Sequence, residues 1–273
     1  MERAPIAVFF ALKNESGYFE DRLEKTSCVH ANGFRIFSGT LGGNAFLSVV
    51  MGVGGSAAEN AVEAVCRIHQ PRMVISAGFA GGLDPKLPKN ALFLPNEIVE
   101  ADSMDWEKER LSLFSRLSPE LLPKELRKET CWGGRLLTVR KIVTKTAEKQ
   151  ELALKYSAQA VDMETWKIAM YCRTLNLPFL AVRAISDAAG ESIPDDVQTL
   201  VDQKTAAARL GAAFQLLLKR PGSAVDLYRL YDSSVASALK LADFLEAFSD
   251  LELLDFLSEN FYPPQESEKF LSA

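Results

Sequence analysis

The sequence predicts a three-layer α/β fold, in which helices flank a central sheet. Short apolar runs rich in β-forming residues alternate along the chain with segments whose apolar residues recur at helical spacing. The run over 179–185 is apolar almost throughout, which is typical of a strand buried on both faces of a sheet. With 273 residues, the chain is long enough for one large α/β domain with an appendage, or for two small domains.

The first half of the chain is expected to alternate strands and helices in a regular way. The expected elements are a strand over 6–12, a hairpin of 33–38 with 45–51, a helix over 56–68 and a strand over 73–77. Ser56 and Glu59, three residues apart, match a capping box at the start of that helix. Pro71 ends the helix and precedes the next strand. The glycine-rich segment 78–83 is expected to be a loop.

The second half continues the alternation and ends in a helical appendage. The expected elements are strands over 91–99 and 136–144, a helix over 146–156, a short strand over 159–161, a helix over 164–175, a strand over 179–185 and a closing helix over 202–219. The charged segment 103–130 is interpreted as an insertion or lid. Apolar residues at three- and four-residue spacing over 224–262 predict further helix. We therefore expect an α/β domain over 1–221 and a helical extension over 222–273.

The composition excludes several classes of function. The net charge of −5 and the isoelectric point near 5.3 argue against nucleic-acid binding, which needs clustered Lys and Arg. Four cysteines without paired spacing fit neither a disulfide framework nor a zinc site, and they indicate a reducing cytoplasm. Only two histidines are present, so a His-rich metal site is excluded. No run approaches the ~20 apolar residues of a membrane span, and we expect a cytoplasmic protein without one.

The most informative segment is the strand over 179–185 and the residues that follow it. The strand ends in Ser186 and Asp187, which places a carboxylate at its carboxyl end. Open α/β sheets form their ligand crevices at this end of their strands. Upstream, the string Val161-Asp-Met-Glu164 supplies two more carboxylates at the start of a predicted helix. These segments predict an acidic site at one edge of the sheet.

Three strings of residues resemble the nucleoside phosphorylase/nucleosidase superfamily, and most closely its methylthioadenosine/S-adenosylhomocysteine nucleosidase branch. They are Arg183-Ala-Ile-Ser-Asp187, Val161-Asp-Met-Glu164 and Ser76-Ala-Gly-Phe-Ala-Gly-Gly-Leu83. The order of motifs follows the superfamily over 5–219. The resemblance implies a phosphorylase-like fold with a mixed, twisted central sheet, a purine nucleoside as substrate, assembly as a homo-oligomer, and no metal or organic cofactor.

By this resemblance, Asp187 is the general acid that protonates the leaving purine, Ser186 is its neighbour, and Arg183 is a positioning residue. Because an aspartic acid in water loses its proton well below neutral pH, this role requires burial or a hydrogen bond that favours the protonated form. The alternative interpretation of Asp187 is an aspartate that caps a helix after the strand.

The resemblance also indicates which residues bind the sugar and which residue activates the attacking water. Glu164 would accept hydrogen bonds from the ribose hydroxyls, and Met163 would pack against the face of the sugar. Glu15, which follows the first strand, would activate the water that attacks C1′. The alternatives are favourable placement of Glu164 at a helix N-terminus and a solvated loop acid at Glu15. Asp162 is interpreted as structural.

The base pocket departs from the family pattern at several positions. In the superfamily the segment 78–83 lines the pocket, here with Phe79, Ala80 and Gly81. Nucleosidases usually carry a serine where Phe79 stands, and phosphorylases carry an arginine where Ser76 stands. The loss of both familiar phosphate ligands favours water as the nucleophile. The aromatic residue that stacks on adenine in nucleosidases corresponds to Lys141 or Ile142, and we take Ile142 as the pocket residue; adenine specificity is left open.

Several alternative functions follow from the same residues. The segment Gly52-Val-Gly-Gly55 is a weak match to a dinucleotide-binding loop, because Ala57 replaces the third glycine. Phosphorolysis, with phosphate as a second substrate, is the alternative to hydrolysis. Two features look more like the hopanoid-associated phosphorylases of the superfamily than like the small nucleosidases. They are the string Gly81-Gly-Leu-Asp-Pro85 and the helical tail. A nucleoside-binding module without turnover is the alternative outside enzymes.

Overall fold

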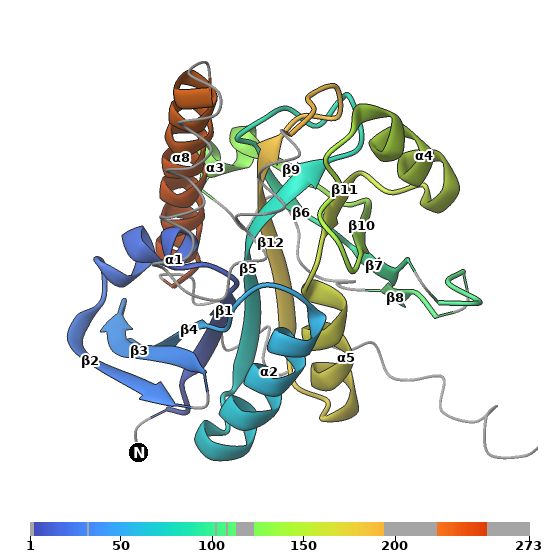
Figure 1. The fold of residues 1–273 in the computed structure, drawn as a ribbon. Helices are drawn as coiled ribbons and strands as arrows, with labels where there is room; N and C mark the ends of the chain where they lie inside the picture. The colour runs from blue at the N-terminus through green and yellow to red at the C-terminus, as the bar shows by residue number, and fades with distance from the viewer. Residues whose placement is uncertain are drawn as a thin grey trace, which may run out of the picture.

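The computed structural model describes residues 3–31, 33–101, 103–107, 109–112, 123–193 and 223–249. Within them, one 12-stranded mixed sheet runs through the molecule with helices packed around it (Figure 1). The strands are β1 (Ile6–Phe10), β2 (Glu24–Ala31), β3 (Phe34–Leu41), β4 (Asn44–Val50), β5 (Met73–Gly82), β6 (Leu92–Leu94), β7 (Glu97–Glu100), β8 (Leu111–Ser112), β9 (Thr130–Trp132), β10 (Arg135–Thr138), β11 (Ala160–Asp162) and β12 (Phe179–Asp187). The helices are α1 (Lys13–Glu20), α2 (Gly55–His69), α3 (Lys124–Glu129), α4 (Thr146–Tyr156), α5 (Thr165–Thr174) and α8 (Ser223–Ser249).

The centre of the sheet is parallel and its flanks are mixed. β1 pairs in parallel with β4 and β5, and β12 pairs in parallel with β5. β11 joins β5 in the antiparallel sense, and the β2–β3–β4 meander closes one edge. The prediction of an α/β fold with a mixed, twisted sheet, flanking helices and a C-terminal helix is confirmed.

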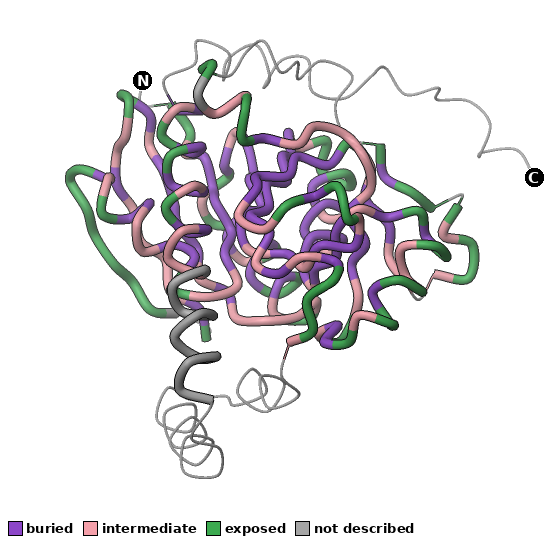
Figure 2. Tube along the Cα trace, turned by 90° about the horizontal axis from the view of Figure 1, so that it is seen from above, coloured by how far each residue is buried: buried purple, intermediate pink, exposed green. Residues whose placement is uncertain are grey.

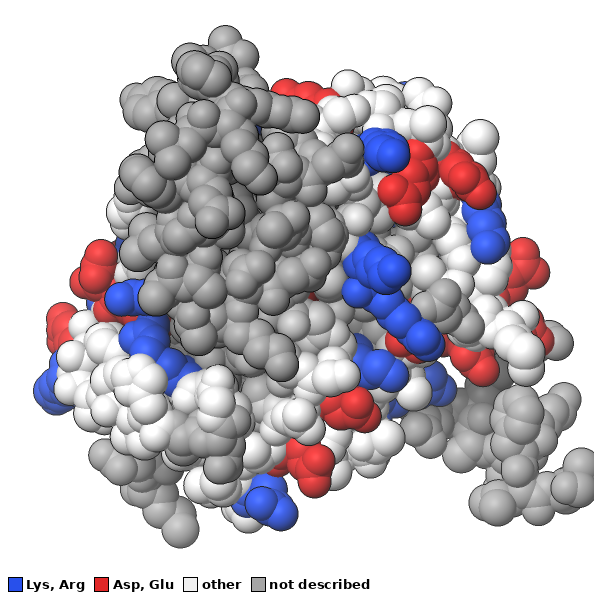
Figure 3. All heavy atoms as spheres, viewed as in Figure 1, with Lys and Arg blue, Asp and Glu red and all other residues white. Residues whose placement is uncertain are grey.

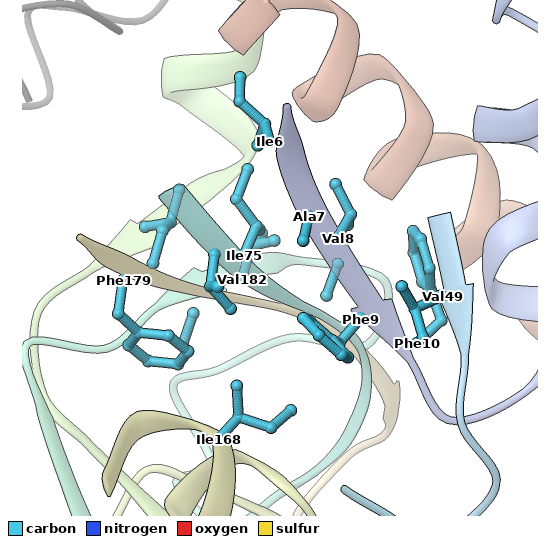
Figure 4. Packing of buried hydrophobic residues seen from close by; sticks show 14 of the residues in the cluster. Ile6, Ala7, Val8, Phe9, Phe10, Val49, Ile75, Ile168, Phe179 and Val182 are labelled. Carbon is cyan, nitrogen blue, oxygen red and sulfur yellow. The ribbon is translucent and has the colours of Figure 1, made fainter. Parts of the chain in front are cut away.

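The core lies on both faces of the central strands. Every residue of β1 is buried, and so is every residue of β12 except Ser186. In Figure 4, α5 lies on one side of these strands, with Ile168 directed toward Phe9, and α8 lies on the other side. Figure 2 shows the same arrangement from above, with the buried strands inside and exposed loops around them. Burial on both faces explains why these strands are continuously apolar.

The helix α8 is an integral part of this core. Its residues Leu241, Phe244 and Phe248 are fully buried in the main hydrophobic cluster. At the surface, Arg22, which follows α1, pairs with Asp243 and Glu246 of α8. The boundary predicted at residue 221 stays a prediction, since residues 194–222 lie outside the described part of the chain, as does the predicted helix over 202–219.

Two predicted segments are wrong in a way that matters for the site. The expected loop over 78–83 is a strand, because β5 continues to Gly82 and pairs there with β11 and β12. The glycines allow this close approach, since a Cβ at Gly81 would lie 3.2 Å from Oδ2 of Asp187. The expected strand over 91–99 is broken at Pro95, which lacks an N–H group, into β6 and β7.

Other boundaries differ for local reasons. The helix α2 begins one residue earlier than expected and its N-cap is Gly54, so the predicted capping box of Ser56 and Glu59 does not form. The positive φ of 96° at Gly54 allows the chain to turn into the helix without a side-chain cap. The strand over 136–144 ends at Thr138, and β2 is an additional strand that sequence patterning did not predict. The bounds of α4 match the prediction.

The surface carries charges of both signs. Figure 3 shows acidic and basic side chains interspersed over one face, with a short row of Lys and Arg atoms. No helix among the described residues is long and apolar enough to cross a membrane.

Candidate active site

A cavity of about 210 Å³ opens beside the carboxyl ends of β1, β5 and β12. Its lining includes the side chains of Glu15, Glu164 and Asp187, which are far apart in the sequence and are each less than 8% exposed. The remaining wall is mostly apolar. None of the described residues that line the cavity is a Lys or an Arg. The fold thus brings the three predicted functional carboxylates together in one cavity, and the part of its lining that the structure describes contains no cation.

Glu15 lies in the first turn of α1, directly after β1. Its Oε2 accepts a hydrogen bond from the Leu12 N–H at 2.8 Å, and its Oε1 accepts one from the Phe79 N–H at 2.9 Å. Burial raises the pKa of Glu15, although these two hydrogen bonds oppose the shift. A buried carboxyl with a raised pKa is suited to accept a proton near neutral pH. The interpretation of Glu15 as a solvated loop acid is therefore wrong.

Glu164 is the N-cap residue of α5, but its side chain does not cap that helix. Its Oε1 accepts a hydrogen bond from the Gly54 N–H at 2.7 Å, and its Oε2 accepts one from the Met163 N–H at 3.2 Å. The glycine segment that resembled a nucleotide-binding loop therefore uses an amide to hold a carboxyl group. Burial, and next the negative charge of Asp162, raise the pKa of Glu164 to about 8.

Replacing Glu164 by Gln is expected to flatten part of the pH dependence of stability. Because the pKa of Glu164 is about 8 in the folded protein and near 4.5 without this environment, the folded state binds more protons between these values. Glu164 therefore contributes fully to the free energy of unfolding below its unperturbed pKa of 4.5. This contribution is lost as the pH rises through the folded-state pKa of about 8, by at most about 1.4 kcal/mol per pH unit.

Urea denaturation of the wild type and of Glu164→Gln, repeated at several pH values between these two pKa values, measures this effect. The unfolding free energy of the wild type should fall more steeply with pH than that of the variant. A Gln at the exposed Glu59 serves as the matched control and should keep the wild-type slope. Equal slopes for the wild type and Glu164→Gln would contradict the prediction.

Asp187 is the last residue of β12 and lies at a β-bulge, where the pairing with β5 shifts by one residue. Its Oδ1 accepts a hydrogen bond from the Ser186 hydroxyl at 2.6 Å. Its Oδ2 accepts a hydrogen bond from the ammonium group of Lys149, a residue of α4. Lys149 was not predicted from the sequence, because nothing in its helical spacing distinguishes it from the other lysines of the chain.

Arg183 does not line the cavity but lies behind its wall. Its guanidinium donates to Oδ2 of Asp162 from Nε at 3.1 Å and from one terminal nitrogen at 2.8 Å. It also donates to the carbonyl and hydroxyl oxygens of Ser76 at 2.8 and 2.7 Å, and to the hydroxyl of Thr165. Asp162 in turn accepts a hydrogen bond from Thr138 at 2.7 Å. This buried network joins β5, β10, β11, β12 and α5 beneath the site.

The other predicted residues form the walls of the cavity. They are Phe79, Ala80 and Gly81 from β5, Met163 after β11, Ile142 from the segment after β10, and Ser186 from β12. Lys141, the alternative to Ile142, is exposed and does not line the cavity. Ser234 of α8 also lines it, a contribution that sequence reasoning missed because the helix was interpreted as an appendage. Among the residues that the structure describes, no cluster of three His, Cys, Asp or Glu side chains is arranged to hold a metal ion.

Residues 5–220 match the sequence model of a family described as the phosphorylase superfamily. This match covers well over half of the chain, and it confirms at the level of the superfamily the resemblance carried by the three strings.

Solved structures of similar fold include three bacterial enzymes. The 5′-methylthioadenosine/S-adenosylhomocysteine nucleosidase from Neisseria meningitidis, in complex with methylthio-immucillin-A, has a TM-score of 0.68 at 20% identity over 89% of this chain and 99% of that one. The corresponding enzyme from S. pneumoniae has a TM-score of 0.64 at 19% identity, with coverage of 89% and 99%. The futalosine hydrolase of Helicobacter pylori has a TM-score of 0.66 at 17% identity, with coverage of 90% and 97%. At these identities the likeness establishes the phosphorylase-like fold.

Proposed function

The chain belongs to the phosphorylase superfamily, a family of enzymes of the nucleosidase and phosphorylase type, and from this premise we propose that it hydrolyses the N-glycosidic bond of a purine nucleoside. The observation that carries the proposal is the convergence of three buried side chains, Glu15, Glu164 and Asp187, on one cavity. The three carboxyl groups then act on different parts of the reaction. Asp187 acts on the leaving base, Glu164 on the sugar and Glu15 on the water.

Departure of the purine requires a proton donor at the base. When the C1′–N9 bond breaks, its electron pair goes to the purine, and the sugar becomes an oxocarbenium-like cation. Asp187 protonates the base, with Ser186 holding one of its carboxyl oxygens at 2.6 Å. Phe79, Ala80, Gly81 and Ile142 enclose the base with backbone and apolar surface.

The other two carboxyl groups act on the sugar and on the attacking water. Glu164 binds the ribose hydroxyls, and Met163 packs against the sugar. Glu15 accepts the proton of the water that attacks C1′. Its two hydrogen bonds to backbone N–H groups hold its carboxyl group in place for this proton transfer.

Water, rather than phosphate, is favoured by the electrostatics of the cavity. A phosphate dianion beside the carboxyl groups of this cavity needs compensating cations, and the described lining contains none. Ser76, which occupies the position of the phosphorylase arginine, is fully buried and hydrogen-bonded to Arg183. The N–H group of Gly54, which could otherwise donate to a phosphate, already donates to the carboxyl group of Glu164. These three observations favour hydrolysis over phosphorolysis, including the hopanoid-associated type.

The finer features of the proposal are a purine base, a cytoplasmic location and assembly as a homo-oligomer. The four cysteines are free, which supports a reducing compartment. The buried carboxyl groups with hydrogen-bonded oxygens support turnover rather than a binding module alone.

Release of free base from a panel of nucleosides tests the proposal. The panel contains 5′-methylthioadenosine, S-adenosylhomocysteine, futalosine, adenosine and inosine, each incubated with and without phosphate. We expect base release without phosphate, with the free sugar as the second product. Release only with phosphate, accompanied by a ribose 1-phosphate, would identify a phosphorylase instead. Binding of a nucleoside without any product would identify a binding module.

A further inference from the structure

Lys149 is a fully buried lysine beside the proposed acid. Its side chain is 0% exposed. Its ammonium group donates to Oδ2 of Asp187 and to the carbonyl oxygens of Ala188 and Glu191, the latter two at 2.8 Å. These three acceptors use all three N–H donors of an ammonium group. A charged group is stable without water only when it is paired and hydrogen-bonded in this way.

The position of this charge relative to the cavity is informative. Asp187 lines the cavity and Lys149 does not, so the carboxyl group stands between the ammonium and the space for the substrate. Ser186 donates to the second carboxyl oxygen at 2.6 Å. The carboxyl group is thus held from two sides, and its orientation is determined by α4 as well as by its own strand.

We propose that Lys149 is a positioning residue for the acid in this reaction, an inference that rests on the proposed function. Both carboxyl oxygens of Asp187 accept hydrogen bonds from protein donors, so the proton that Asp187 transfers is taken up from solvent as the nucleoside binds. As the C1′–N9 bond breaks, this proton moves to the purine, and Asp187 becomes a carboxylate again. The ammonium group of Lys149 stabilises this carboxylate as it forms, because both side chains are buried and solvent screens their attraction only weakly. Glu15 takes a proton from the attacking water, and exchange with solvent returns one proton to Asp187 before the next turnover.

A purely structural role for Lys149 makes a different prediction. In that case the ammonium only ties α4 to the segment 188–191, and its loss would slow cleavage of every substrate alike. If Lys149 instead assists proton donation, its loss affects only substrates whose leaving base needs a proton. A nucleoside methylated at N7 of the purine carries a positive charge on the base and releases it as a neutral molecule. Cleavage of this substrate requires no acid.

The test compares Lys149→Met with the wild type on a panel nucleoside that the wild type cleaves and on its N7-methylated counterpart. We expect kcat for the ordinary nucleoside to fall ~100-fold with little change in KM. For the N7-methylated nucleoside we expect a loss of less than about fivefold. Lys155→Met, the same change at an exposed lysine of α4, is the matched control and should stay within about twofold on both.

A second comparison avoids the risk that Lys149→Met alone is unstable. Removing both partners of a buried pair leaves no unpaired charge, so Asp187→Asn with Lys149→Met is compared with Asp187→Asn. Circular dichroism must show that Asp187→Asn is folded, because this variant leaves the buried ammonium group of Lys149 without its charged partner. Because Lys149 acts through Asp187, the added change should cost less than about threefold. Two results would overturn the inference while leaving the proposed function intact. One is a further ~100-fold loss of kcat in the double variant. The other is an equal loss of kcat on both nucleosides in the first comparison. If the wild type cleaves no nucleoside, the proposed function and this inference fall together.

Discussion

Asp187→Asn is expected to lower kcat for nucleoside cleavage by about 10²- to 10⁴-fold, the usual contribution of a general acid. Asn has the shape of Asp and accepts a hydrogen bond through its carbonyl oxygen, but it has no acidic proton to transfer. Asp187 lines the cavity and is 4% exposed, so water cannot readily replace it as a donor. The purine must then leave as an anion, which raises the barrier to cleavage.

Steady-state release of base from the best panel nucleoside measures this effect, and circular dichroism shows whether the variant is folded. Asp84→Asn is the matched control, because Asp84 follows β5 outside the cavity and its carboxylate accepts a hydrogen bond from the Lys86 N–H. The control should keep wild-type kcat. A folded Asp187→Asn protein with more than about a tenth of the wild-type kcat would exclude Asp187 as the acid.

Arg183→Met is expected to lower the free energy of unfolding by about 3–5 kcal/mol, the range found when one partner of a buried ion pair is removed. The Arg183 and Asp162 side chains are 3% and 1% exposed and lie 2.8 Å apart. Without the guanidinium, the carboxylate of Asp162 loses its cationic partner in an environment that water does not reach. The carbonyl oxygen of Ser76 also loses its side-chain donor.

Urea denaturation followed by circular dichroism measures the change in stability. Arg110→Met is the matched control, because Arg110 is half exposed and its closest distance to Glu97 is 3.8 Å. A surface pair of this kind contributes about 0–1 kcal/mol. If the two variants lose the same stability, the network around Arg183 is not a structural support of the site.

The sequence predicts well those features that depend on neighbours along the chain. The continuous apolar run of β12 predicts a central strand because both faces of that strand are buried. The bounds of α4 follow from residues within the helix itself. The strings around Asp187 and Glu164 identify carboxyl groups at strand and helix ends, and the fold places both in the lining of one cavity.

Features that depend on distant partners could not be predicted. The glycines over 78–82 suggest a loop, and they form a strand only because β11 and β12 lie beside them. Ser56 and Glu59 match a capping box, but a glycine with positive φ already turns the chain at Gly54.

By itself the sequence determined the α/β class, the superfamily and three of the carboxyl groups that line the cavity, those of Glu15, Glu164 and Asp187. These features depend on local patterns of a few residues. Only the tertiary structure decided that Lys149 faces Asp187, that Arg183 supports the site from behind, and that Ser234 of α8 reaches the cavity. The reason is physical. A buried charge needs partners that replace water, and these partners come from elements far apart in the chain, whose positions are set by packing of the core.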